Sequence, residues 1–121
     1  MAKRVLIIDD DSEFADILSD ILEANDYTVF VASDGVQAIE KTKEEPVDLI
    51  LMDIQMPVLS GFWFCDVFKK KAETKDIPII MISGLSDKDN AKKARELGAC
   101  AFLKKPFQAE ELFSMIEKYA A

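Results

Sequence analysis

The chain has 121 residues, of which 50% are hydrophobic and 31% charged, an ordinary balance for one soluble domain with a proper core. A formal net charge of -8 argues against partners such as nucleic acids and against docking on anionic membranes. No apolar run approaches the roughly 20 residues that a membrane-spanning helix needs, so we expect a single domain over residues 1–121.

Five short apolar runs with strand character recur at regular spacing along the chain. They are Val5–Ile8, Tyr27–Ala32, Leu49–Met52, Ile79–Ile82 and Ala101–Leu103. Four of them are nearly continuous in apolar residues, which is typical of strands that are covered on both faces.

A helical pattern follows each of these runs. The first has apolar residues at helical spacing, Phe14, Ile17, Leu18, Ile21 and Leu22, after a cap at Asp11 or Ser12. The second covers Asp34 to about Lys43, because Pro46 blocks its continuation.

The remaining three helices are expected near Gly61–Glu73, at Asp87–Leu97 and at Ala109–Tyr119. Gly98 fits a left-handed cap after the fourth helix, whereas Gln108 is a weak cap before the fifth. Strand followed by helix, five times over, predicts a doubly wound α/β domain, (βα)5, with a parallel five-stranded sheet.

The cysteines and the start of the chain bear on the compartment. Cys65 and Cys100 lie in apolar contexts, so we expect buried thiols of a cytoplasmic protein and no metal or redox site. Met1–Arg4 leads directly into a strand, which predicts no secretory signal. The lack of histidine removes the commonest general base.

Polar side chains follow four of the predicted strands. They are Asp9 and Asp10 after the first, Asp53 after the third, Ser83 after the fourth, and Lys104 and Lys105 after the fifth. The carboxyl ends of parallel strands share one edge of the sheet, where ligands bind in this class of fold. We therefore expect carboxylates, a hydroxyl and ammonium groups to meet at that edge.

The tripeptide Asp9-Asp10-Asp11 allows two interpretations. Gathering like charges costs free energy, and a hard divalent cation with oxygen ligands is the usual reason to accept that cost. The same residues could instead form a solvated acidic turn that caps the next helix. The tripeptide alone does not decide between them.

The combined set of groups favours phosphoryl transfer to a carboxylate. An aspartate can attack phosphorus and hold an acyl phosphate. A divalent ion must then neutralise part of the negative charge, a lysine can clamp one phosphoryl oxygen, and a hydroxyl can donate to another.

These residues together resemble the receiver domain of two-component response regulators, over essentially the whole chain. The matching segments are Asp9-Asp10, Asp53-Ile54-Gln55-Met56-Pro57 with Gly61, Ser83-Gly84, and Lys105-Pro106-Phe107. The resemblance implies a flavodoxin-like sheet of order 2-1-3-4-5. It also implies a phosphoacceptor that switches a protein-interaction face and catalyses only its own phosphorylation and dephosphorylation, rather than a metabolic enzyme.

The resemblance also assigns roles. Asp53 would be the phosphoacceptor, and Mg²⁺ would bind to Asp10, Asp53 and the carbonyl of Gln55, with Asp9 acting through water. Lys105 would be the clamp rather than Lys104, because it directly precedes Pro106, and the bond between Lys105 and Pro106 would be cis. Ser83 would be the hydroxyl group.

The family further implies partners and a switch. The phosphoryl donor would be a histidine kinase or a phosphotransfer protein, and a downstream effector protein would read the fourth helix, fifth strand and fifth helix. Phe102 falls at the aromatic switch position, where it can change its burial but lacks the hydroxyl of a tyrosine.

Three alternatives share parts of this pattern. A flavodoxin would need a phosphate-cradling loop after the first strand, where the three acids would repel phosphate. A phosphatase of the haloacid dehalogenase type would use the spacing of Asp9 and Asp11, but the chain lacks the usual cap and extra length. A degenerate receiver acting only as a docking module would not need every chemical position filled.

The single tryptophan stands apart from the chemistry. On the third helix, Phe64, Cys65 and Phe68 share one side, and Trp63 falls nearly opposite them. We expect Trp63 to be exposed, either on a partner surface or as an isolated apolar residue of the kind that is common on surfaces.

Overall fold

The computed structural model describes residues 2–56, 58–84 and 88–120. Strands and helices alternate throughout: β1 Arg4–Ile8, α1 Ser12–Glu23, β2 Thr28–Ala32, α2 Gly35–Glu44, β3 Leu49–Asp53, α3 Gly61–Lys70, β4 Ile79–Ser83, α4 Lys88–Glu96, β5 Ala101–Lys104 and α5 Ala109–Tyr119. The predicted strands and helices are confirmed, with ends that shift by one residue in most cases. The start proposed for α4, Asp87, lies outside the described residues.

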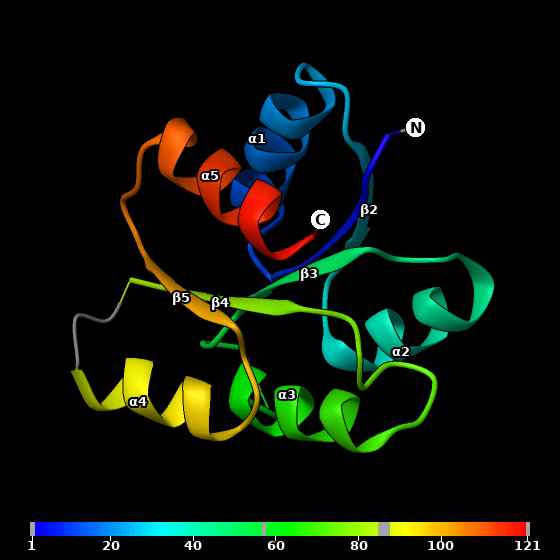
Figure 1. The fold of residues 1–121 in the computed structure, drawn as a ribbon, viewed down its shortest axis with the longest axis vertical. Helices are drawn as coiled ribbons and strands as arrows, with labels where there is room; N and C mark the ends of the chain where they lie inside the picture. Colours follow the sequence, from blue (N-terminus) through cyan, green and yellow to red (C-terminus); the bar gives the residue numbers. More distant parts are fainter. Residues whose placement is uncertain (1, 57, 85–87, 121) are drawn as a thin grey trace.

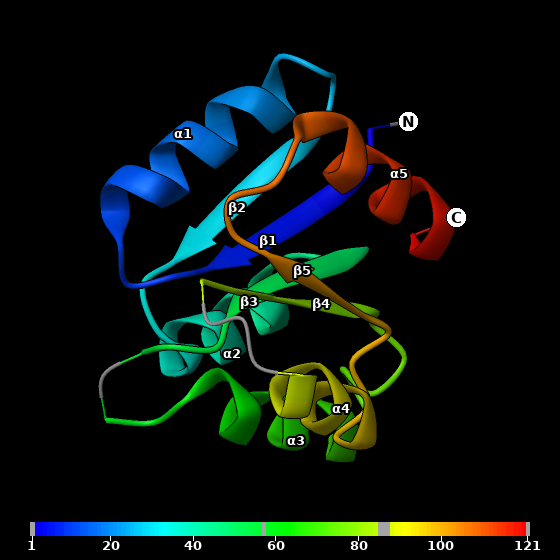
Figure 2. The same cartoon turned by 90° about the vertical axis from the view of Figure 1, so that its left-hand side faces the viewer.

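The five strands form one parallel sheet of order β2-β1-β3-β4-β5, as expected. Helices α1 and α5 cover one face, and α2, α3 and α4 cover the other (Figures 1 and 2). The central strands β1, β3 and β4 are therefore buried on both faces, which explains their continuous apolar sequences.

Two hydrophobic layers hold these helices to the sheet. One lies on the side of α2 to α4 and includes Phe64 and Phe68, and the other lies on the side of α1 and α5 and includes Leu22 and Leu112. Each layer takes alternate residues of the same strands, because successive side chains of a strand point to opposite faces.

The helix starts follow ordinary capping chemistry. Asp34 accepts a hydrogen bond from the amide of Gln37 at 2.8 Å, and Ser60 accepts one from Trp63 at 3.4 Å. Gln108 makes no side-chain cap, as its weak propensity predicted. Gly98 has a φ of 105°, which confirms the left-handed turn expected after α4.

The prediction that α3 runs to about Glu73 is wrong, because the helix ends at Lys70. Lys71 is extended, and the hydroxyl of the buried Thr74 donates to the carbonyl of Phe68 at 2.6 Å. The side chain of Lys69 donates to the carbonyl of Ile77 at 2.7 Å. The Thr74 hydroxyl satisfies a carbonyl in the last turn of α3, and Lys69 ties this end of the helix to the segment before β4, so the chain turns away from the helix early.

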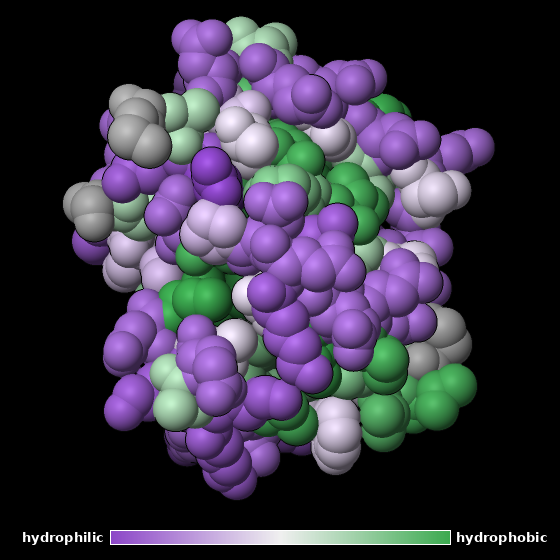
Figure 3. Space-filling view, turned by 90° about the vertical axis from the view of Figure 1, so that its right-hand side faces the viewer, coloured by the Kyte–Doolittle hydropathy of each residue, from purple (hydrophilic) through white to green (hydrophobic). Residues whose placement is uncertain are grey.

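The surface around α2 and the β2 edge is mainly hydrophilic, with separate hydrophobic areas (Figure 3). On α2, Lys41 pairs with Glu44 at 3.5 Å, and Lys43 lies 4.0 Å from Glu40. In the described part of the chain, no helix is both long and apolar enough to cross a membrane.

Candidate functional site

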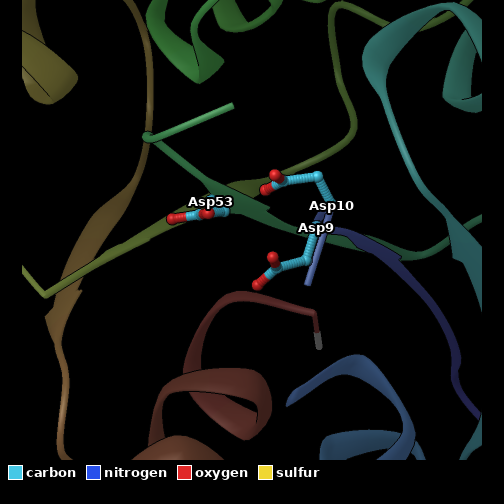
Figure 4. Close-up of side chains that lie close together, drawn as sticks. All are labelled: Asp9, Asp10 and Asp53. Carbon is cyan, nitrogen blue, oxygen red and sulfur yellow. The ribbon is translucent and has the colours of Figure 1, made fainter. Parts of the chain in front are cut away.

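Three carboxylates converge at the carboxyl ends of β1 and β3. Ile8 pairs with Met52 across the sheet, so Asp9 and Asp10 leave β1 beside Asp53, the last residue of β3. One oxygen from each carboxylate lies within 4.8 Å of the others. Figure 4 shows the three side chains, which we call the carboxylate cluster, turned toward the same side. Asp9 and Asp53 are buried and Asp10 is exposed.

The third acid of the tripeptide has a different role. Oδ1 of Asp11 accepts hydrogen bonds from the amides of Glu13 and Phe14, at 3.1 and 3.2 Å, and so caps α1. The amide of Asp11 donates to Oδ1 of Asp9 at 2.9 Å. Asp11 is therefore the cap of α1, whereas Asp9 and Asp10 belong to the carboxylate cluster, whose binding of a cation stays a prediction.

Lys105 brings a positive charge to the carboxylate cluster. Its Nζ lies 3.5 Å from Oδ2 of Asp9, whereas Lys104 is exposed. The amide of Lys105 donates to the carbonyl of Ser83 at 2.8 Å, which ties the start of the β5–α5 loop to the end of β4. The peptide bond between Lys105 and Pro106 is cis, as the motif led us to expect.

Two further predicted site residues lie at neighbouring strand ends: Gln55 in the loop after β3, and Ser83 as the last residue of β4. Ser83 is fully buried at the end of β4, the strand beside β3. The amide of Gln55 donates to Oδ1 of Asp53 at 3.3 Å, and Gln55 lines a shallow pocket together with Asp10. The role of the Gln55 carbonyl as a metal ligand stays a prediction.

The environment of Asp53 disfavours its charged form. Burial, followed by repulsion from Asp9, raises the pKa of Asp53 to about 6. The positive charge of Lys105 and the amide of Gln55 oppose this shift of the pKa without cancelling it. A cation bound by the cluster would offset the negative charges that repel one another. Carboxylate oxygens are the ligands that hard divalent cations prefer.

Gly61 lets the loop after β3 pack tightly against the strand end. Its amide donates to the carbonyl of Ile54 at 2.9 Å. A Cβ at this position would lie 2.2 Å from the carbonyl oxygen of Asp53, a distance that no side chain tolerates. Glycine is therefore needed here to keep the backbone of Asp53 in place.

Sequence reasoning missed one residue at the site. From the sequence, Phe14 was only one of the apolar residues at helical spacing on α1. In the structure its ring lies under the ammonium group of Lys105, 3.9 Å from the ring centroid. The signal that could have found it is its place in the first turn of the helix that follows the acids.

Other predicted residues lie at a distance from the chemistry. Trp63 is 50% exposed, as expected, and makes an edge-to-face contact with Phe64. Phe102 is partly buried against the layer that underlies α2 to α4. Cys65 is buried and Cys100 partly so; both thiols are free, and burial raises the pKa of Cys65 to about 11.

Residues 5–117 match the response regulator receiver domain family. The chain belongs to this family. Its fold is therefore that of a receiver domain of two-component signalling, a family of signalling switches.

Relatives and solved structures agree with this assignment. The receiver domain is 32% identical over 117 residues to the phosphate regulon transcriptional regulatory protein PhoB of Klebsiella pneumoniae, covering 97% of this chain and 51% of that protein. It is 36% identical over 114 residues to the probable transcriptional regulator ycf27 of Porphyridium aerugineum, covering 94% and 46%. The chain thus spans about half the length of these curated relatives.

Among solved structures, the chemotaxis protein CheY4 of Vibrio cholerae superimposes with a TM-score of 0.92 at 28% identity, covering 98% of this chain and 99% of that one. A receiver domain of a Pseudomonas aeruginosa sensor histidine kinase superimposes with a TM-score of 0.89 at 23% identity, covering 99% and 98%. That structure has a magnesium ion coordinated in its active-site cleft.

Proposed function

We propose that Asp53 accepts a phosphoryl group from a histidine kinase or phosphotransfer protein in a Mg²⁺-dependent reaction. The observation that carries this proposal is the meeting of the carboxylate cluster with the ammonium group of Lys105 at one sheet edge. The acids alone would repel a phosphoryl group, and the lysine alone would not retain a cation. The acids and the lysine together suit a negatively charged phosphoryl group that binds with a divalent cation.

The groups present divide the work as follows. An oxygen of Asp53 attacks phosphorus, the bond from phosphorus to the donor nitrogen breaks, and the donor nitrogen keeps the electron pair. Lys105 pairs with a phosphoryl oxygen, and the hydroxyl of Ser83 donates to another. When bound to the carboxylate cluster, Mg²⁺ would offset its negative charge and orient the phosphoryl oxygens.

The proposal extends to the rest of the domain. Hydrolysis of the acyl phosphate at the same site would return Asp53 to its starting state, so the chain catalyses only its own modification. Movement of Ser83 toward the phosphoryl group would pass to Phe102, which lies two residues before Lys104 on the neighbouring strand β5. A downstream effector would then bind the face of α4, β5 and α5.

We place the reaction in the cytoplasm, where thiols stay reduced, because Cys65 and Cys100 are both free. We also propose that residues 1–121 form one receiver domain. The alternative phosphatase reading, with Asp9 as nucleophile and Asp11 as its partner, is opposed by the structure, because the carboxylate of Asp11 is engaged in capping α1.

Acetyl phosphate provides the test. The wild-type protein is treated with acetyl phosphate and Mg²⁺, its intact mass is measured, and the acyl phosphate is trapped and mapped. We expect one phosphoryl group on Asp53, and none in Asp53→Asn or after chelation of the metal. Modification that persists in either case would refute the proposal.

Asp11→Asn is the matched control, because asparagine caps helices as well as aspartate does. We expect it to be phosphorylated like the wild type, whereas a nucleophile of the haloacid dehalogenase type would fail in this variant. In the phosphorylated wild type, amide shifts should extend from the Asp53 loop to Phe102. Shifts confined to that loop would contradict the proposed signalling face.

A further inference from the structure

The ammonium group of Lys105 lies between a carboxylate and an aromatic ring. Its Nζ is 3.5 Å from Oδ2 of Asp9 and 3.9 Å from the centroid of the Phe14 ring. About a quarter of the lysine side chain is exposed, whereas Asp9 is buried. The distance to Asp9 is long for a hydrogen bond. The ring of Phe14 is therefore a second partner that attracts the ammonium group.

The ring of Phe14 is itself held in place. The amide of Phe14 donates to the cap residue Asp11 at 3.2 Å, which fixes the backbone in the first turn of α1. The ring meets Phe107 edge to face, with centroids 6.3 Å apart and an interplanar angle of 89°. Phe107 follows Lys105 by two residues, so the aromatic pair and the lysine form one unit across α1 and the β5–α5 loop.

Other lysines of the described residues also lie over rings, and they show how close this contact is. Lys93 is 4.7 Å from the centroid of Phe62, and Lys41 is 5.6 Å from that of Phe30. The contact between Lys105 and Phe14 is shorter than either. The attraction of a cation to a ring face strengthens when both are shielded from water, so this partly buried pair should be the stronger one.

We propose that Phe14 is a positioning residue for Lys105: its ring face keeps the ammonium group at the carboxylate cluster. A lysine side chain has four rotatable bonds and is strongly hydrated, so an ion pair with one carboxylate at 3.5 Å leaves it much freedom. The ring restricts that freedom without neutralising the charge. Lys105 then meets the phosphoryl group from a fixed place, and this role rests on the proposed function.

The competing explanation is that Phe14 only packs against Phe107 as an apolar cover. The two explanations differ in what they require of the ring. Packing depends on its size and shape, whereas the attraction to Lys105 depends on the negative charge of its face. Fluorine atoms on the ring withdraw that charge and change its size little.

The experiment replaces Phe14 with phenylalanine analogues that carry increasing numbers of fluorine atoms. The rate of phosphorylation by acetyl phosphate with Mg²⁺ is followed by intact mass, and the melting temperature is measured for each protein. We expect the rate to fall stepwise, to about one-fifth for the fully fluorinated ring, at a nearly constant melting temperature. Phe14→Tyr should be phosphorylated at the wild-type rate, and Phe14→Leu, which has no ring, should be as slow as the fully fluorinated protein.

The same series at Phe30 is the matched control, because that ring faces Lys41 away from the site. Its members should all be phosphorylated at the wild-type rate. A second readout needs neither metal nor donor: the ring current of Phe14 should shift the ε-methylene protons of Lys105 upfield. The shift should vanish in Phe14→Leu, and Lys105→Gln identifies the signal.

Two results would overturn the positioning role: a rate that is constant across the Phe14 series, or ε-methylene protons of Lys105 that are unshifted in the wild type. In both cases a phosphorylated wild type leaves the proposed function intact. A wild-type protein that is never phosphorylated refutes the proposed function itself, and the positioning role with it.

Discussion

At the amino-terminal edge of the sheet charges of opposite sign meet, whereas at the carboxyl edge like charges gather. The amide of Arg4 donates to Asp48 at 2.7 Å, and its guanidinium group lies 3.8 Å from Glu45. At the other edge the carboxylate cluster has Lys105 as its close positive partner. Exposed opposite pairs stabilise a fold slightly, but three crowded carboxylates make the metal-free fold less stable.

The difference shows where the domain gives up stability for chemistry. Arg4 and Asp48 join the starts of β1 and β3, and the carboxylate cluster lies at the other ends of the same two strands. There, burial and then repulsion from Asp9 raise the pKa of Asp53, and the crowded carboxylates leave a site that gains free energy when a cation binds. Three measurements would separate the two edges.

Metal binding should give the largest effect. Mg²⁺ binds the folded carboxylate cluster, so the melting temperature should rise with its concentration, by the equivalent of about 2.7 kcal/mol at a hundredfold excess over the dissociation constant. Thermal unfolding followed by circular dichroism measures this. Asp48→Asn, at the opposite edge, should keep the full response, whereas Asp53→Asn should lose most of it. A wild-type melting temperature that ignores millimolar Mg²⁺ would contradict the site.

The pH dependence of the metal-free protein should give an intermediate effect. The pKa of Asp53 is about 6 in the fold, chiefly because of burial, and about 3.9 in an unfolded chain. Since the folded value is the higher one, the protonated carboxyl favours folding. This contribution is complete below about pH 4 and is lost as the pH rises through about 6.

The loss should be on the order of 1 kcal/mol, allowing for access of water to the site. Denaturant unfolding in the presence of a chelator, between pH 4 and pH 7, measures it against Asp53→Asn, which lacks the titrating group. The stability advantage of the variant should grow with pH across this range. An advantage that stays constant would show that Asp53 has an ordinary pKa.

A matched pair of substitutions should give the smallest effects, with opposite signs. Asp10→Asn removes one of three like charges and should stabilise the metal-free protein by about 0.5 kcal/mol. Asp48→Asn weakens the charge-assisted bond to Arg4 and should destabilise it by about 0.5–1 kcal/mol. Urea unfolding at low salt gives both values. Changes in the free energy of unfolding that have the same sign in both variants would contradict the contrast between the two edges.

Much of the site could be located from the sequence, because parallel strands leave little choice. Asp9, Asp53, Ser83 and Lys105 each lie at or just after the end of an apolar run, and every such end lies at the same sheet edge. The receiver motif then distinguished Lys105 from Lys104, and the structure places Lys105 beside Asp9. The positions of the strands and helices likewise follow from periodicity, whereas the strand order was implied by the resemblance to receiver domains, and the structure has that order.

Only the tertiary structure decided how neighbouring residues of one type divide their roles. Asp10 and Asp11 cannot be told apart from the sequence, yet Asp10 belongs to the carboxylate cluster and Asp11 caps α1. Phe14 and Ile17 are both apolar residues at helical spacing on α1, yet the ring of Phe14 lies under Lys105 and Ile17 is 60% exposed. The local sequence pattern cannot assign different roles to such neighbours, because their roles depend on contacts with residues of other helices, strands and loops.

The early end of α3 has the same kind of cause. Local propensity continues the helix past Lys70, but the Thr74 hydroxyl and the Lys69 ammonium group bond to backbone carbonyls only in the folded chain. The sequence by itself determined which strands and helices form and which edge carries the chemistry, since these depend on periodicity along the chain. Side-chain partners depend on distances between elements, which exist only once the sheet and its helices have packed.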